Sequence, residues 1–284
     1  MVIRVLVFSI LIGNAFLIRV ERIVGGFYTE IEMAPYMLSL RANGKHRCGA
    51  VLIGKEWGLT AAHCCIERTS SGPIDLTVRG SSSRLYGPCG LEHRITRVVR
   101  HSGYRGDNDD WDLCAIKLYP PVEFTNRFAP VGLPELRLND DKHPPPVSND
   151  ISFNHDEFVY ATVLGEEDKT VPERAVVSGW GSFQVDGNTP SPILKSLNVT
   201  KVDLQICKNV YRDKYIVHDR DVCYGTGIKS EDTCKGDSGG PLVSEDSILV
   251  GIVSFGDECG YSILPGIYTD IFQFREWIER TTGL

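Results

Sequence analysis

Short apolar runs alternate with turns along most of the chain and form two sets that a long polar stretch separates. Apolar runs of this length, bounded by turns rich in Gly, are typical of β-strands. At 272–280 the apolar residues instead have helical spacing, which predicts a short C-terminal helix. The runs are Tyr36–Leu40, Ala50–Ile53, Leu76–Val78, Ile95–Val99 and Leu113–Leu118, then Ala175–Ser178, Leu194–Val202, Pro241–Val243, Leu249–Val253 and Gly266–Tyr268. The pattern predicts an all-β protein.

The polar stretch at 135–173 lies between the two sets of predicted strands. It contains ten acidic residues against three basic ones, and three consecutive prolines at 144–146. Such a composition does not bury enough apolar surface to form a core of its own. We therefore expect an exposed connection between two β domains.

The N-terminus has the pattern of a secretory signal peptide at 1–18, with a cleavage site that could lie as early as residue 15. Arg4 supplies a positive charge, Val5–Ile12 is apolar apart from one serine, and 13–15 are small or polar. A membrane anchor is the alternative, but the apolar stretch is shorter than the roughly 20 residues that a spanning helix needs. We expect a secreted, extracellular protein.

Cysteine content and charge narrow the class of protein further. Nine cysteines in a secreted chain predict disulfides and at least one unpaired thiol. The sequence has no CxxC pair, which argues against a zinc site. The net charge is −7. Residues 1–22 carry a net +2 (three arginines, one glutamate), so the chain without them has −9. Nucleic acid and anionic membranes are therefore not expected as partners.

The glycine-rich segment Gly236–Pro241 presents one serine, Ser238, directly after Asp237. Glycines let a backbone approach a substrate closely, and the N–H groups of such a turn can point together at a developing negative charge. A simple surface turn has a similar composition. A catalytic serine also needs a base and a group that orients the base. The candidates are His63, which follows an apolar run, and Asp112, which directly precedes one.

These motifs together resemble the chymotrypsin-fold serine endopeptidases of the trypsin-like branch. The resemblance covers residues 23–284 apart from the acidic stretch. The matching segments are Ile23–Gly26, Ala61–Cys64, Asp112 with its strand, Ser178–Gly181, Gly236–Pro241, Val253–Gly256 and Pro265–Tyr268. The resemblance implies two six-stranded antiparallel Greek-key β-barrels, at about 36–130 and 174–270, with the active site between them and the helix at 272–280.

The same resemblance implies a role for each matching residue. Ser238 would be the nucleophile, His63 the general base and Asp112 its orienter. The N–H groups of Gly236 and Ser238 would form the oxyanion hole. Further positions would bind substrate: Asp232 and Thr233 at the primary pocket, Gly256 and Gly266 in its walls, and Ser254 and Phe255 on the strand that pairs with the substrate. Asp232 favours cleavage after Arg or Lys. Phe255 replaces a usual tryptophan and Glu258 a usual glycine, with an effect on specificity that the sequence leaves open.

A short propeptide at 19–22 is expected to be removed by cleavage after Arg22. The new amine of Ile23 would then pair with Asp237 and activate the zymogen. The partners expected are an activating protease, polypeptide substrates and protein protease inhibitors, and we expect a monomer. The alternative is a catalytically silent homologue that acts by binding.

By resemblance the disulfides are Cys48–Cys64, Cys207–Cys223 and Cys234–Cys259. Cys114 is then expected to be a free core thiol, which leaves Cys65–Cys89 as a hypothetical fourth bridge. Thr29 and Ser196 stand at the two halves of a bridge that trypsins commonly have. Ser81 stands where calcium-binding trypsins have a glutamate, so we expect no metal and no cofactor. Asn198 begins an N-glycosylation sequon in a predicted strand.

Overall fold

The computed structural model describes residues 26–65, 68–69, 72–106, 110–136, 171–182, 189–228, 235–256 and 264–284. The expected signal peptide, the Arg22–Ile23 site and most of the acidic stretch lie outside these residues. So do Asp232, Thr233, Cys234, Glu258 and Cys259. No helix in the described ranges is long and apolar enough to cross a bilayer.

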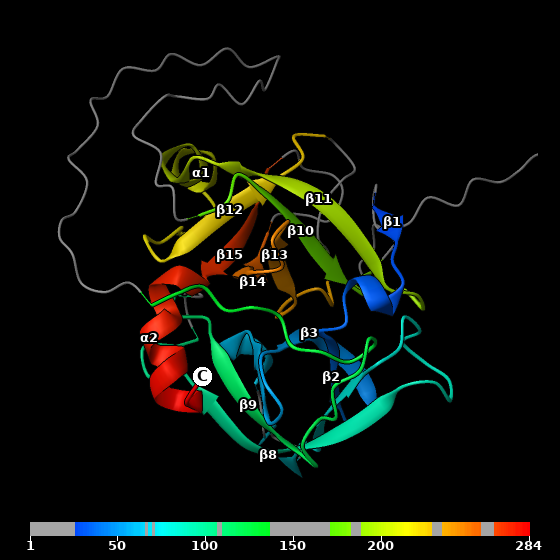
Figure 1. Ribbon diagram of the computed structural model, residues 1–284. Helices are drawn as coiled ribbons and strands as arrows, with labels where there is room; N and C mark the ends of the chain where they lie inside the picture. Colours follow the sequence, from blue (N-terminus) through cyan, green and yellow to red (C-terminus); the bar gives the residue numbers. More distant parts are fainter. Residues whose placement is uncertain are drawn as a thin grey trace, which may run out of the picture.

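The first set of strands closes into a barrel in which every neighbouring pair is antiparallel (Figure 1). The order around the ring is β2-β3-β4-β9-β8-β7. The strands are β2 (Met37–Ala42), β3 (Lys45–Leu52), β4 (Trp57–Thr60), β7 (Leu76–Gly80), β8 (Leu91–Arg100) and β9 (Cys114–Tyr119). The hairpin between β7 and β8 is long, and the small hairpin β5 (Arg68–Thr69) and β6 (Gly72–Pro73) precedes β7.

The second set forms a ring in the order β10-β11-β12-β15-β14-β13, closed by the pairing of β10 with β13. The strands are β10 (Arg174–Gly179), β11 (Lys195–Val202), β12 (Asp221–Gly225), β13 (Pro241–Ser244), β14 (Leu249–Phe255) and β15 (Gly266–Asp270). Numbered in chain order within each ring, both barrels read 1-2-3-6-5-4. The expected fold class, two six-stranded antiparallel barrels, is confirmed.

The apolar runs locate five strands of each barrel, and in both barrels the third strand is the one that the runs do not indicate. β4 is short and has a glycine in its middle, and β12 begins with a buried aspartate and ends in glycine. Neither sequence shows the apolar pattern of a strand. Each segment is extended because it pairs with neighbouring strands.

Each end of the described chain crosses to the opposite barrel. β1 (Phe27–Tyr28) precedes the first barrel but pairs with β11 of the second. The C-terminal helix α2 (Ile271–Thr282) follows the second barrel, yet its buried residues belong to a core cluster that consists mostly of first-barrel residues. Figure 1 shows α2 beside the first barrel. The two barrels are therefore fastened to each other by both ends.

The expected helix at 272–280 is present as α2, one residue longer at its start and two at its end. Asp270 caps its N-terminus by accepting from the N–H of Phe272, and Gly283 ends it in a left-handed conformation. The helix α1 (Leu204–Tyr211) was not expected from the sequence. Only Cys207 and Tyr211 are buried on it, which is too few for a readable helical period. Two 3₁₀ turns complete the list, η1 (Ile31–Met33) and η2 (Ala62–Cys64).

Candidate active site

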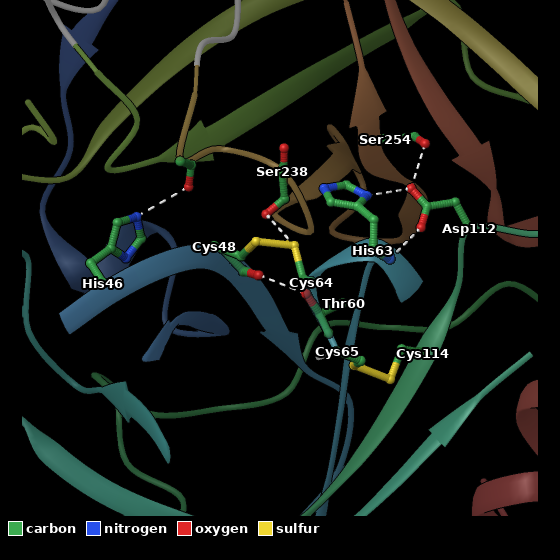
Figure 2. The surroundings of a disulfide bond; sticks show 12 residues. His46, Cys48, Thr60, His63, Cys64, Cys65, Asp112, Cys114, Ser238 and Ser254 are labelled. Atoms are coloured by element: carbon green, nitrogen blue, oxygen red, sulfur yellow. Dashed lines mark hydrogen bonds and ion pairs between the residues drawn. A yellow bond between two sulfur atoms is a disulfide. The ribbon is translucent and has the colours of Figure 1, made fainter. Parts of the chain in front are cut away.

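His63 and Asp112 are joined by two hydrogen bonds at the edge of the first barrel (Figure 2). His63 lies in η2 directly after β4, and its backbone N–H donates to Asp112 Oδ1 at 2.9 Å. Its ring Nδ1 is 2.8 Å from Asp112 Oδ2. Because a carboxylate only accepts, Nδ1 carries the proton. The other ring nitrogen, Nε2, is then left as the acceptor.

The carboxylate of Asp112 is almost fully buried and is surrounded by donors. Besides His63, the hydroxyl of Ser254 on β14 donates to Oδ2 at 2.6 Å. The hydroxyl of Thr269 on β15 donates to the backbone carbonyl of Asp112 at 3.0 Å. A buried carboxylate is costly unless hydrogen bonds of this kind satisfy it. The second barrel therefore helps to hold a residue of the first.

Ser238 lies in the turn that precedes β13 of the second barrel. In Figure 2 it is on the side of the His63 ring opposite Asp112. Main-chain bonds hold the turn: the N–H of Gly49 donates to the Ser238 carbonyl at 2.8 Å, and the N–H of Gly239 donates to the Val253 carbonyl at 2.7 Å. The structure thus brings the three predicted triad residues together at the junction of the barrels.

The glycines of this turn are required by its geometry. Gly236 and Gly239 have φ of +100° and +78°, which favours residues without a Cβ. A Cβ on Gly239 would lie 2.1 Å from Thr60 Oγ1 and 2.6 Å from the Gly49 carbonyl oxygen. The turn that carries Ser238 and the first barrel are therefore in contact through backbone atoms.

The N–H groups of Gly236 and Ser238, the expected oxyanion donors, are not hydrogen-bonded to any acceptor within the part of the chain that the structure describes. Backbone N–H groups in a protein are almost always paired unless water or a ligand meets them.

Asp237 points away from this turn into a cradle of two glycines. Its Oδ1 accepts from the N–H of Gly181 at 2.7 Å, and the residue is 3% exposed. A Cβ on Gly179 or Gly181 would approach the carboxylate oxygens to about 2 Å, at 1.9 and 2.1 Å respectively. The glycines are therefore the reason that a carboxylate fits here. Ile23, its expected partner, lies outside the described residues.

His46 of β3 is a site residue that the sequence did not indicate. Its Nε2 is 3.1 Å from the Gly236 carbonyl, and its Nδ1 is 2.8 Å from the Ser39 hydroxyl. Burial lowers the pKa of His46 to about 4, so the ring is neutral at physiological pH. Nε2–H then donates to Gly236, and Ser39 donates to Nδ1. This chain of bonds fixes the carbonyl of an expected oxyanion residue.

The described residues of the expected substrate-binding group come from the ends of β14 and β15. Phe255 is half-buried and packs against Tyr211 and Tyr215, with ring centroids 6.4 and 5.5 Å away. Gly256 is exposed with open space where a Cβ would be, whereas Gly266 is buried against the Tyr268 ring. β14 and β15 are adjacent antiparallel strands, in which Phe255 lies opposite Ile267, the residue after Gly266.

Two expected disulfides, Cys48–Cys64 and Cys207–Cys223, are present. The hypothetical Cys65–Cys89 bridge is wrong, and Cys114 is not a free thiol. Cys65 is bonded to Cys114, and Cys89 is a free, exposed cysteine in the long β7–β8 hairpin. The cause is the register of β4 and β9, which sets Cys114 opposite Thr60 and beside the turn that carries the buried Cys65.

The remaining predicted positions have these surroundings. The Thr29 hydroxyl donates to Ser196 Oγ at 2.6 Å, so a buried hydrogen bond occupies the place of the missing bridge. Asn198 is exposed on β11. Within the described ranges, the one group of potential metal ligands is Cys48, His63 and Cys64, whose two sulfur atoms are bonded to each other.

A charged cluster supports the segment in front of Asp112. Arg220 makes a bidentate ion pair with Asp110, at 2.9 and 2.7 Å, and its guanidinium lies 4.0 Å from the centre of the Trp111 ring. His101 stacks on the same ring at 4.5 Å. The neighbouring Asp221 is buried, and this burial raises its pKa to about 7.

Comparison with known proteins agrees with the geometry. Residues 23–152 and 147–278 match the family model for Trypsin. Trypsin 5G1 of Aedes aegypti is 34% identical over 265 residues, which cover 93% of this chain and 86% of that protein. Transmembrane protease serine 11E of Mus musculus is 35% identical over 267 residues, or 93% of this chain, and transmembrane protease serine 11C of the same species is 33% identical over 270, or 94%. The chain belongs to the trypsin family of serine proteases. It spans 55% of the length of each mouse relative.

Proposed function

We propose that this protein is a secreted serine endopeptidase, made as a zymogen and active after cleavage at Arg22–Ile23. The observation that carries the proposal is the double hydrogen bond from His63 to Asp112, with Ser238 on the opposite side of the ring. Because both its backbone N–H and its ring Nδ1 are bonded to Asp112, the His63 ring is held in a fixed orientation, with Nε2 on the side away from Asp112. That arrangement serves a general base.

In the proposed reaction, Ser238 Oγ attacks the scissile carbonyl while His63 Nε2 takes the hydroxyl proton. The same proton then passes to the leaving amine, and the acyl-enzyme remains on Ser238. Water, deprotonated by His63, releases the acid. Asp112 keeps the imidazole in the productive tautomer and stabilises its charged form.

The oxyanion that develops during attack would be held by the N–H groups of Gly236 and Ser238. One such donor stabilises a transition state by about 3 kcal/mol. His46 supports this role indirectly, because its bond to the Gly236 carbonyl fixes the orientation of the neighbouring peptide group. Ser254–Gly256 would pair with the substrate as an added strand.

Cleavage after Arg or Lys is proposed on the identity of Asp232 and on the small wall residues Gly256 and Gly266. A carboxylate in a narrow pocket favours a cationic side chain, since an unpaired buried charge is costly. Thr233 would line the same pocket. The relative described as a trypsin is compatible with this proposal.

Activation would work through Asp237. Its carboxylate is buried in the Gly179 and Gly181 cradle, with Gly181 as a neutral donor. The amine of Ile23 would supply the positive charge there and order the turn that contains Ser238. Support comes from the family match, which begins at residue 23. The proposed partners are an activating protease, polypeptide substrates and protein protease inhibitors.

The test is hydrolysis by protein that begins at Ile23, using matched chromogenic peptides that end in Arg, Phe or Ala. We expect the Arg peptide to be preferred by at least a hundredfold in kcat/KM, and Ser238→Ala to be inactive. Preference for the Phe peptide would contradict the role of Asp232. If wild type and Ser238→Ala are equally inactive on all three, the silent homologue is the better description.

A further inference from the structure

Two consecutive disulfides fasten the turn that carries His63 (Figure 2). Cys64 is bonded to Cys48 of β3, and Cys65 to Cys114, the first residue of β9. All four cysteines are buried. The first bridge is the one that the family resemblance implies, whereas the second is not. The position of the Cys65–Cys114 bridge indicates a role of its own.

The second bridge joins the neighbours of the base to the neighbours of its orienter. Cys65 is two residues after His63, and Cys114 is two residues after Asp112. In addition, Cys114 is the register partner of Thr60, the last residue of β4. Cys114 therefore meets the turn at both ends, through strand pairing before His63 and through a disulfide after it.

The turn has few hydrogen bonds of its own with which to keep this shape. η2 is three residues long, and its backbone bonds are those from Cys64 to Ala61 and from Cys65 to Ala62. Short 3₁₀ turns have weak hydrogen-bond geometry. The two bonds between His63 and Asp112, at 2.9 and 2.8 Å, nevertheless need both backbones to stay in place. A displacement of about 1 Å can cost a factor of roughly 10² in rate.

We propose that the Cys65–Cys114 disulfide is a positioning device that keeps His63 and Asp112 in hydrogen-bonding register. The inference rests on the proposed peptidase function. It assigns to the bridge an effect on turnover, beyond the stability that any disulfide gives. When the bridge is absent, the turn shifts relative to β9, and His63 spends less time in the productive orientation.

The test replaces both cysteines together, so that neither leaves a thiol that could pair with the exposed Cys89. In C65A/C114V the valine fills volume and suits a strand, and C65A/C114A changes the packing at the same site. The matched control is C207A/C223A, which removes a bridge between α1 and β12. Each protein is compared with wild type at a temperature at which all are folded.

For both Cys65/Cys114 variants we expect kcat to fall at least tenfold while KM stays within twofold. We also expect the proton NMR resonance of His63 Nδ1–H, which a carboxylate partner moves far downfield, to broaden or disappear. The control should keep both kcat and this resonance. If neither variant folds, partial reduction of the native protein, with the open bridge mapped by mass spectrometry, gives the same resonance comparison.

An unchanged kcat and an unchanged resonance, with only a lower Tm, would overturn the proposal and leave the bridge a structural one. An equal loss of kcat in the control would overturn it as well. A different result would concern the proposed function itself. If the wild-type protein hydrolyses no peptide, that function fails, and the NMR comparison alone decides whether the bridge positions His63.

Discussion

The two barrels hold their parts of the candidate active site by different means. In the first barrel, side chains hold His63 and Asp112: a carboxylate with several donors, two disulfides, and the ion pair between Arg220 and Asp110 nearby. In the second barrel, backbone atoms hold Ser238, because its turn packs glycine against the main chain of β3 and is hydrogen-bonded through N–H and C=O groups.

This difference predicts two kinds of sensitivity. The positions of His63 and Asp112 depend on particular polar atoms, so that changes of the same size but different chemistry should be damaging. The turn that carries Ser238 depends on the absence of side chains at its glycines, so that even a methyl group should be damaging. Three substitutions test this contrast, in order of decreasing effect on turnover, and a fourth tests the buried carboxyl of Asp221, which interacts with Asp110 and Asp112.

Asp112→Asn should have the largest effect, because it keeps the shape of the side chain and changes its chemistry. The amide N–H₂ no longer accepts from His63, which favours the wrong imidazole tautomer. We expect kcat to fall by about 10⁴, the magnitude known for the Ser-His-Asp template of this family. Asp246→Asn, an exposed change of the same kind, is the control and should be neutral. Turnover within tenfold of wild type would refute the polar-atom account of the first barrel.

Gly239→Ala tests the turn that carries Ser238. The new methyl group would overlap Thr60 Oγ1 at 2.1 Å, which forces the turn to move. A shift near 1 Å predicts at least a hundredfold loss of kcat/KM. Gly44→Ala is the matched control, since Gly44 has nearly the same φ, +76°, with nothing within 4 Å of its Cβ. Both variants share the left-handed strain of about 1–2 kcal/mol, so equal kinetics would show that close packing is unimportant.

Ser254→Ala removes one donor to Asp112 and leaves those from His63. A hydrogen bond to a charged group contributes about 1.5–3 kcal/mol. We expect the lower end of this range to appear as a loss of transition-state stabilisation, which is roughly tenfold in kcat. Ser244→Ala deletes a buried hydroxyl in the β13–β14 hairpin and serves as the control. A loss as large as that of Asp112→Asn would mean that the second barrel controls the orienter.

Asp221→Asn should change activity least and stability most visibly with pH. Burial raises the pKa of Asp221 to about 7, with Asp110 and Asp112 adding to the effect and Arg220 opposing it. The unfolded chain therefore loses this proton at lower pH than the folded protein. Wild-type stability should fall as the pH rises from about 4 to about 7.

The asparagine variant does not have this titration, and its amide oxygen can still accept from the His218 N–H, as Asp221 does at 2.7 Å. We expect it to be more stable than wild type at pH 8 by on the order of 4 kcal/mol, and nearly equal at pH 4. Thermal unfolding at the two pH values measures the difference. A constant difference would show that Asp221 does not titrate in this range.

The sequence predicted the elements and residues that local patterns indicate. Alternating apolar runs located most strands, and the spacing after residue 271 located the C-terminal helix. The motif around Ser238, with His63 and Asp112 earlier in the chain, predicted the residues that the fold brings together. β4, β12 and α1 were not found, because each is short and has little apolar pattern of its own.

The rest depends on contacts between distant parts of the chain. His46 has its role only because Gly236, 190 residues later, lies beside it. Cys114 is bonded to Cys65 because β4 and β9 pair in one register, which no local pattern defines. The same holds for the buried hydrogen bond between Thr29 and Ser196, 167 residues apart.

The most direct test of the proposed peptidase is covalent labelling by a fluorophosphonate, followed by intact-mass and peptide mapping. In protein that begins at Ile23, we expect one adduct per chain, located on Ser238, and no adduct in Ser238→Ala or in His63→Ala. Correctly folded wild-type protein that takes no label on Ser238 would contradict the account.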